Sequence, residues 1–303
     1  MEWKKDLLST PVKFLFIALC LTSCKNPLLH HNSPIDVVIE ENFFEQRTCI
    51  IGDTGTGSSD QFLVAKALAQ DVCHNIIHTG DLIYPKGLKN ASSEQFQSKF
   101  SAPFKENLEV SRFFLTLGNH DYRRNPKAWL DIARENEALI YPHPFYGVKF
   151  KDACLTFIDT NLNFRKGQEL WLQDQIKDFN ETCKIKIAIA HHPLISSGHH
   201  GKAHGMVDKF LSQYILSNYD LYLAGHDHQL SIETKLSGTA LAISGAGAKI
   251  RPIKNKKATY SLSDLGYMVL SFENDKATLD IKRVDESGIA HTAFTYPLEI
   301  KRN

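Results

Sequence analysis

Residues 221–228 read Leu-Tyr-Leu-Ala-Gly-His-Asp-His, a short apolar run followed at once by a glycine and two histidines. The apolar part, 221–224, is typical of a buried β-strand. In extended backbone, side chains two residues apart point the same way, so His226 and His228 would present both imidazoles to one side. The stretch therefore predicts a strand that delivers a pair of metal ligands at its carboxyl end.

Further segments with the same design lie earlier in the chain. Each places a small residue, usually glycine, beside Asp, Asn or His, and four of the five segments follow an apolar run typical of a strand. One such segment alone is most simply a turn or a helix cap, but their recurrence in one chain indicates a shared site. The others are Gly52-Asp53-Thr54-Gly55, Gly80-Asp81-Leu82-Ile83-Tyr84, Gly118-Asn119-His120-Asp121 and Ala190-His191-His192-Pro193.

Strand-like and helix-like stretches alternate from residue 48 onward. We expect strands at 48–51, 76–78, 113–117 and 185–190, and helices at 60–69, 168–179 and 206–216. The first helix should begin after Ser59 as its N-cap and should bury Phe62, Ala65 and Leu68 on one face. Beyond residue 228 the strand-like runs are close together and suggest antiparallel pairing. The pattern predicts an α/β fold whose strand ends bring the polar segments together.

Composition excludes several classes of protein. The 303 residues are 43% hydrophobic and 23% charged, with a net charge of +1. A chain of this length can bury one large core. A charge so near zero gives no reason to expect nucleic acid or an anionic membrane surface as a partner.

The N-terminus is expected to lie outside the fold. The apolar run 14–21 is far shorter than the ~20 residues that span a bilayer, and lysines precede it, as in a secretory signal. Leu21-Thr22-Ser23-Cys24 resembles a bacterial lipobox. We therefore expect a lipoprotein-type signal peptide over 1–23, a tether over 24–44 and a folded body over 45–303. A plain signal peptide cleaved near Ser23 is the alternative. Both place the body in the periplasm or on the cell surface, with membrane contact only through lipid on Cys24.

Export affects how the remaining cysteines are interpreted. An even number of them stays in the body, in an oxidising compartment. Four cysteines allow three connectivities. We hypothesise the bridges Cys49–Cys73 and Cys154–Cys183, because each would close one strand-helix-strand unit. Buried free thiols are the alternative.

The candidate metal ligands are too numerous for one tetrahedral zinc. Carboxylate, phenolate and amide oxygens are hard ligands, and imidazole suits iron and zinc. Such a set fits two ions that share a carboxylate, an arrangement that clamps a phosphoryl group and activates water near neutral pH. The set comprises Asp53, Asp81, Tyr84, Asn119, His191, His226 and His228.

The order of these segments resembles that of the metallophosphoesterase superfamily. Tyr84, three residues after Asp81, makes the chain similar to the purple acid phosphatases, and in particular to their small tartrate-resistant acid phosphatase type. The resemblance runs from about Thr48 to about Pro297. It implies a four-layer α/β/β/α sandwich of two mixed sheets, and it makes 45–303 the catalytic domain.

The resemblance also implies a role for each ligand. Asp53, Tyr84 and His228 would hold Fe(III). Asn119, His191 and His226 would hold a divalent ion, which is Fe(II), Zn or Mn. Asp81 would bridge the two ions.

Further roles follow for residues near the substrate. His120 would act on the substrate phosphate, together with a second histidine for which His199 and His200 compete. Spacing from His191 favours His200. Asp121 would orient His120, unless it only stabilises the turn.

The expected activity is that of a binuclear-metal acid phosphatase. It would hydrolyse small phosphate monoesters by in-line attack of metal-bound hydroxide. A metallophosphodiesterase or nucleotide hydrolase of the same superfamily is one alternative, and a surface protein that binds metal or phosphate without turnover is another. The pattern leaves the natural substrate and the oligomeric state open.

Overall fold

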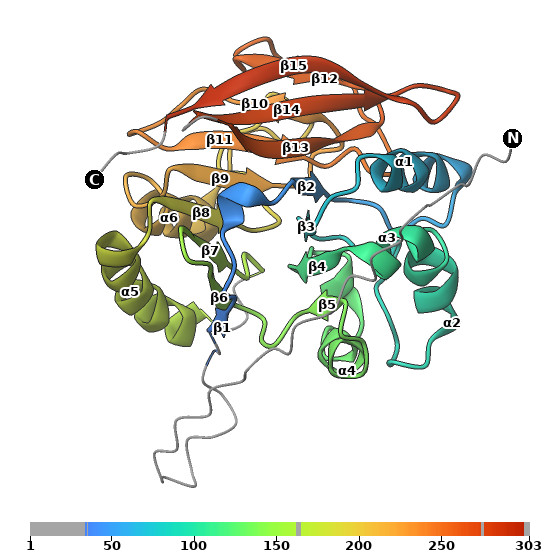
Figure 1. The fold of residues 1–303 in the computed structure, drawn as a ribbon, viewed down its shortest axis with the longest axis horizontal. Helices are drawn as coiled ribbons and strands as arrows, with labels where there is room; N and C mark the ends of the chain where they lie inside the picture. The colour runs from blue at the N-terminus through green and yellow to red at the C-terminus, as the bar shows by residue number, and fades with distance from the viewer. Residues whose placement is uncertain (1–33, 35, 162–164, 274–275, 300–303) are drawn as a thin grey trace, which may run out of the picture.

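The computed structural model describes residues 34, 36–161, 165–273 and 276–299. Two mixed β-sheets share one hydrophobic core, to which strands of both contribute, and helices lie outside each sheet (Figure 1). This α/β arrangement confirms the fold expected from the sequence.

The first sheet has eight strands. A parallel block occupies its middle, and β10 and β12 add antiparallel strands at one edge. In spatial order the strands are β1 (Val37–Val38), β6 (Tyr146–Lys149), β7 (Ala153–Phe157), β8 (Ile185–Ile189), β9 (Leu221–Ala224), β11 (Ala240–Ser244), β10 (Leu230–Ile232) and β12 (Tyr260–Leu262).

The second sheet has seven strands. Its first half is antiparallel, as expected for the end of the chain, and its second half is parallel. In spatial order the strands are β15 (Ala290–Leu298), β14 (Lys276–Val284), β13 (Gly266–Glu273), β2 (Thr48–Ile51), β3 (Asn75–His78), β4 (Arg112–Leu115) and β5 (Leu139–Ile140).

Helices cover the outer faces. Those beside the seven-stranded sheet are α1 (Ser59–Gln70), α2 (Glu94–Phe96), α3 (Lys105–Val110) and α4 (Ala128–Glu135); those beside the eight-stranded sheet are α5 (Arg165–Thr182) and α6 (Gly205–Tyr214) (Figure 1). Shorter turns are η1 (Phe43–Glu45), the π-helical η2 (Gln97–Ser101) and η3 (Asp121–Arg123).

The central strands are apolar on both faces because both faces are covered. In β8, Ile187 and Ile189 enter the core between the sheets, whereas Ala188 packs into a second cluster with Leu172 of α5 and Phe210 of α6. Continuous apolar runs in the sequence therefore mark strands buried on two sides.

Helix α1 differs in detail from the expectation. Its N-cap is Ser58, whose Oγ accepts a hydrogen bond from the Gln61 amide, and not Ser59. Ala65 and Leu68 are buried as expected, but Phe62 is 44% exposed and Val64 is buried in its place. The buried face is therefore rotated from the one that the sequence predicts.

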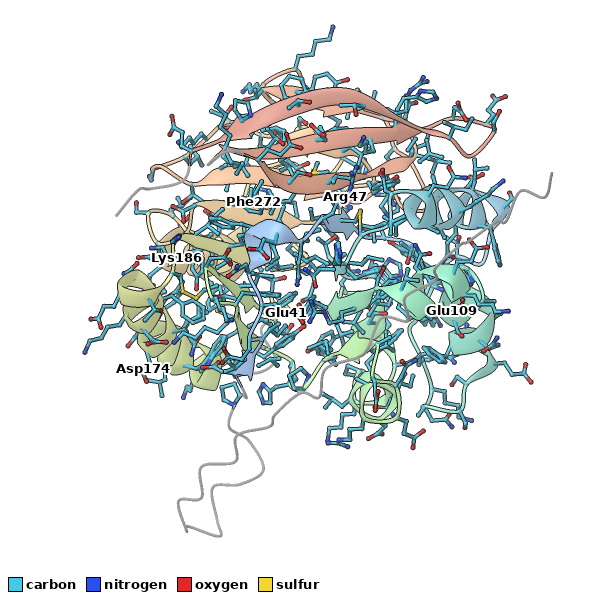
Figure 2. All side chains as sticks on the ribbon, in the orientation of Figure 1. Glu41, Arg47, Glu109, Asp174, Lys186 and Phe272 are labelled. Atoms are coloured by element: carbon cyan, nitrogen blue, oxygen red, sulfur yellow. A yellow bond between two sulfur atoms is a disulfide. The ribbon has the colours of Figure 1, made fainter. Side chains whose placement is uncertain are left out.

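The segment just before residue 45 belongs to the fold, although the sequence assigns it to the tether. Strand β1 pairs in parallel with β6. Phe43 is fully buried, and the ring of Phe44 stacks on Phe272, labelled in Figure 2, at 4.3 Å between centroids. Apolar burial fixes this stretch despite its lack of periodicity. The expected signal peptide and Cys24 lie outside the described residues.

Both hypothesised disulfides are confirmed. Cys49 is bridged to Cys73 and Cys154 to Cys183, so each links a strand to the stretch that precedes the adjacent parallel strand. Paired cysteines are typical of chains that fold in an oxidising compartment. Within the described ranges, we find no helix with the length and apolar character needed to cross a membrane.

Removing one bridge should destabilise the protein markedly. Cys49 and Cys73 are 24 residues apart. In the chain-entropy model, closing a loop of that size raises the free energy of the unfolded chain by about 3.5 kcal/mol. We expect the double substitution Cys49→Ala, Cys73→Ala to lower the free energy of unfolding by roughly that amount. Urea titration of both proteins measures it; an unchanged midpoint would contradict the expectation.

Candidate metal centre

The expected site residues come from the carboxyl ends of five parallel strands. Asp53, Asp81 and Asn119 follow β2, β3 and β4 of one sheet, and His191 and His226 follow β8 and β9 of the other. The sequence predicted convergence at a sheet edge, and the structure adds that the edges of two sheets supply it. All seven candidate ligands are linked by short contacts.

One group of candidate ligands consists of Asp53, Tyr84 and His228. The Tyr84 hydroxyl donates to Asp53 Oδ1 at 2.8 Å and lies 3.1 Å from His228 Nε2. His228 Nε2 is 3.6 Å from Asp53 Oδ1. Asp53 is fully buried and Tyr84 nearly so. A carboxylate oxygen, a phenol oxygen and an imidazole nitrogen thus face one point that is shielded from bulk water.

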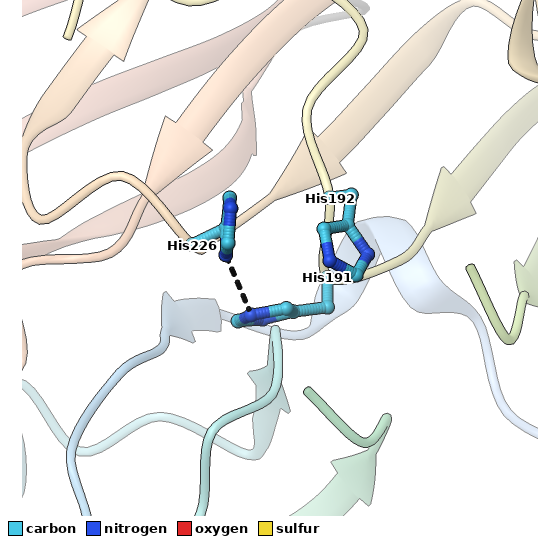
Figure 3. A group of neighbouring side chains, drawn as sticks. All are labelled: His191, His192 and His226. Atoms are coloured by element: carbon cyan, nitrogen blue, oxygen red, sulfur yellow. Dashed lines mark hydrogen bonds between the residues drawn. The ribbon is translucent and has the colours of Figure 1, made fainter. Parts of the chain in front are cut away.

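The second group consists of Asn119, His191 and His226. Asn119 Oδ1 lies 3.1 Å from both His191 Nε2 and His226 Nδ1, and these two ring nitrogens are 3.2 Å apart (Figure 3). His191 Nδ1 lies 2.9 Å from the Thr79 carbonyl. That carbonyl can only accept, so Nδ1 carries the proton and the Nε2 lone pair faces Asn119.

Asp81 lies between the two groups. Its Oδ1 is 3.5 Å from His191 Nε2 and accepts a hydrogen bond from the His120 amide at 2.9 Å. Ligand atoms of Asp53, Asp81 and His191 all lie within 4.8 Å of one another. A carboxylate in this position can contact an ion in either group.

The backbone around the ligands is strained. Asp53, Asp81 and His226 have φ of 57°, 55° and 70°, a region that costs roughly 1–2 kcal/mol for a residue with a Cβ. Close packing also explains why position 118 is a glycine, because a Cβ there would lie 2.1 Å from Asp81 Oδ1. Such strain is characteristic of sites that a fold holds for function.

Burial disfavours charge on the cluster's own side chains. It raises the pKa of Asp53 well above its ordinary value, an effect that Asp81 increases. Burial also lowers the pKa of His191 well below its ordinary value, and it lowers that of His228 to about 4, helped by Arg251. The result is a pocket of neutral imidazoles rich in lone pairs. A cation would favour ionised carboxylates and neutral imidazoles, so these residues fit metal ions.

His120 stands beside this cluster, but its expected partner is different. His120 Nδ1 lies 2.7 Å from the Pro85 carbonyl, so Nε2 faces Asp81 Oδ2 at 3.9 Å. The Asp121 carboxylate instead accepts hydrogen bonds from the amides of Leu82, Ile83 and Gly118. In these contacts Asp121 fixes the two loops that carry Asp81 and Asn119, which corresponds to the turn-stabilising alternative.

Of the two competing histidines, His200 is the one against the cluster. Its ring stacks on that of His226 with 4.1 Å between centroids. The Asp227 carboxylate accepts a hydrogen bond from the His200 amide at 3.0 Å and holds this turn in place. His199 lies farther out, with its ring against that of His200 at 5.0 Å.

His192 is a residue that the sequence analysis did not select. Its ligand nitrogen lies within 4.8 Å of those of His191 and His226 (Figure 3). Its Nδ1 is 2.9 Å from Thr160 Oγ1, and burial lowers its pKa to about 4. The available signal was its position directly after a candidate ligand at a strand end.

His78 should make stability depend on pH. It is fully buried and links the loop that carries Asp53 to the loop that carries Asp81. Its Nδ1 accepts a hydrogen bond from the Gly80 amide, and its Nε2 lies 2.9 Å from Thr54 Oγ1. Burial lowers its pKa from 6.5 to about 3. Because the unfolded chain binds the proton first, this stabilisation is complete above pH 6.5 and is lost as the pH falls toward 3.

The test compares the protein with a His78→Gln variant. Between pH 7 and pH 5 the parent should lose about 2 kcal/mol more unfolding free energy than the variant. Denaturant titrations at both pH values, with metal content checked, measure this difference. If the difference in unfolding free energy between the two proteins did not change with pH, the assignment of a neutral buried His78 would be contradicted.

Comparisons with known proteins found a family match and several relatives. Residues 46–230 match the family model described as calcineurin-like phosphoesterase. Tartrate-resistant acid phosphatase type 5 of Oryctolagus cuniculus is 25% identical over 242 residues, which cover 68% of this chain and 74% of that protein. Purple acid phosphatase 4 of Arabidopsis thaliana is 30% identical over 230 residues, covering 66% and 67%.

A solved structure is similar over most of the chain. GAP50, described as the anchor in the inner membrane complex of Plasmodium, aligns with a TM-score of 0.72 and 23% identity, over 84% of this chain and 89% of that one. At this identity the likeness shows the fold alone.

Proposed function

This chain belongs to the calcineurin-like phosphoesterase family, and we propose that it is a binuclear-metal acid phosphatase acting on phosphate monoesters. The observation that carries the proposal is that six of the seven candidate ligands form two groups of three, with Asp81 between them. Relatives named tartrate-resistant and purple acid phosphatase support it.

In this proposal each group holds one metal ion. Asp53, Tyr84 and His228 would hold Fe(III), because a phenolate and a carboxylate are hard anionic ligands. Asn119, His191 and His226 would hold Fe(II), Zn or Mn, and Asp81 would contact both. When bound, two such cations would acidify a water molecule for attack on phosphorus and withdraw charge from the phosphoryl oxygens.

The chain's own residues would complete the reaction. His120 has Nδ1 fixed by the Pro85 carbonyl, which leaves Nε2 to contact a phosphoryl or leaving-group oxygen. His200 stacks on His226, so it would approach the same phosphate from the side of the second ligand group. Proton donation by one of them to the departing alcohol would accelerate bond breaking. The Asp121 carboxylate would hold the loop that carries Asp81 in place against the loop that carries Asn119.

We propose further that the protein acts outside the cytoplasm. The two disulfides support folding in an oxidising compartment. A lipid on Cys24 would hold the enzyme at a membrane surface while the body faces soluble substrates.

The proposal is tested by hydrolysis of para-nitrophenyl phosphate at mildly acidic pH, with bis(para-nitrophenyl) phosphate as the diester control. Faster turnover of the monoester is expected. Faster turnover of the diester would make the protein a phosphodiesterase. No turnover of either ester by protein that carries both metals would identify a binding protein without catalysis.

A further inference from the structure

Two basic side chains from one short loop lie beside the proposed site. Arg251 Nη1 is 3.2 Å from His200 Nε2. The Lys249 ammonium lies 4.3 Å from the centre of the Tyr84 ring. Each therefore contacts a residue of the proposed centre. A net charge of only +1 on the whole chain means that this local concentration does not follow from a general excess of basic residues.

The loop is fixed rather than free. The Arg251 amide donates to the carbonyl of His228 at 2.8 Å, and the Arg251 carbonyl accepts from Ser263 Oγ at 2.7 Å. Lys254 donates to the His199 carbonyl at 2.7 Å, which attaches the loop to the turn that presents His200. These contacts hold the main chain that carries both side chains, so the loop presents them from a fixed position beside the site.

Among the described residues, neither positive charge forms an ion pair. Within the described residues, no carboxylate oxygen lies within 4.0 Å of the Lys249 or Arg251 side-chain nitrogens. Lys99 and Lys254 are also near the site, but their ammonium groups already donate to backbone carbonyls. Arg251 keeps further guanidinium N–H donors, and Lys249 has only a ring as its described partner. Such a pair is suited to a small, highly charged anion.

Starting from the proposed function, we propose that Lys249 and Arg251 form a subsite for a second phosphoryl group on the leaving group. Preferred substrates would then be phosphoanhydrides, such as pyrophosphate or a nucleoside diphosphate. In the reaction the terminal phosphorus gains a bond to a water oxygen, and its bond to the bridging oxygen breaks. The departing phosphate takes one proton of that water, so no further reactant is needed.

Binding to the metal-loaded protein tests the subsite without requiring turnover. Calorimetry compares methylenediphosphonate, which cannot be hydrolysed, with methylphosphonate, and metal content is measured in the same samples. The parent should bind the diphosphonate more tightly. In Lys249→Gln and in Arg251→Gln, the ratio of the two affinities should fall about tenfold, the equivalent of ~1.4 kcal/mol. Lys256→Gln, an exposed position on the same loop, should keep the parent's ratio.

Kinetics identify the source of the second phosphate. Values of kcat/KM for pyrophosphate and for ADP, each divided by that for para-nitrophenyl phosphate, should fall by a similar factor in both variants. An effect on only one of the two anhydrides would identify that one as the preferred class. Affinity ratios that do not change in either variant would overturn the subsite even if para-nitrophenyl phosphate is hydrolysed. Absence of any ester hydrolysis would refute the proposed function instead, while the binding ratios still decide the subsite.

Discussion

Asp81→Ala is expected to lower phosphatase turnover by roughly three orders of magnitude or more, because it removes a ligand that both metal groups would share. Its carboxylate lies 3.5 Å from His191 Nε2 and 3.9 Å from His120 Nε2, between the two proposed groups. The same change should release metal. Kinetics with an aryl phosphate and metal analysis of one sample measure both effects.

The control for this variant is Asp174→Ala. Asp174 is an exposed carboxylate of α5, labelled at the outer side of the molecule in Figure 2, and its removal should leave turnover and metal content at the parent's values. Asp81→Asn keeps the shape of the side chain and should still lose most activity, because an amide is a poor bridge. Turnover within tenfold of the parent for Asp81→Ala, with both metals retained, would contradict the account.

His200→Ala should lower kcat by about a hundredfold, and His120→Ala by a similar factor, the usual range for a proton-transferring or oxyanion-stabilising side chain. Both variants should retain their metals, because neither ring belongs to the proposed ligand groups. The loss should appear mainly in kcat, since these groups are expected to act on charge that develops during bond breaking.

His199→Ala is the matched control for His200. The two residues are adjacent and both are exposed, but only the His200 ring stacks on His226. Activity close to that of the parent is expected for His199→Ala. If His199→Ala lost activity and His200→Ala did not, the two assignments would have to be exchanged.

Residue patterns predicted the strands well, and the candidate ligands selected from them lie close together in the structure, for a physical reason. Strands such as β2 and β9 are buried on both faces, so they appear as uninterrupted apolar runs between polar turns. The candidate ligands follow directly at their carboxyl ends. Both disulfides were also predictable, because each closes a unit visible in the sequence.

Features that depend on tertiary packing were not predictable from local patterns. The buried face of α1 is set by contacts with β13 and β14, and this leaves Phe62 outside. Phe44 enters the fold because Phe272, distant in sequence, offers a stacking partner. The contacts of Asp121 with Leu82 and Ile83 join loops from different strands.

The loop that carries Lys249 and Arg251 was missed for the same reason. Lys249 and Arg251 resemble surface residues in the sequence, and only the path of the chain between β11 and β12 brings them to Tyr84 and His200. His192 was not among the residues selected from the sequence. Its proximity to His226 appears only when β8 and β9 pair.

Visible spectroscopy of the purified protein, combined with metal analysis, tests the central claim most directly. The account predicts about two metal ions per molecule, at least one of them iron, and a broad band in the green region that disappears in Tyr84→Phe. A protein without iron, and with fewer than two metals per molecule even after reconstitution, would contradict it.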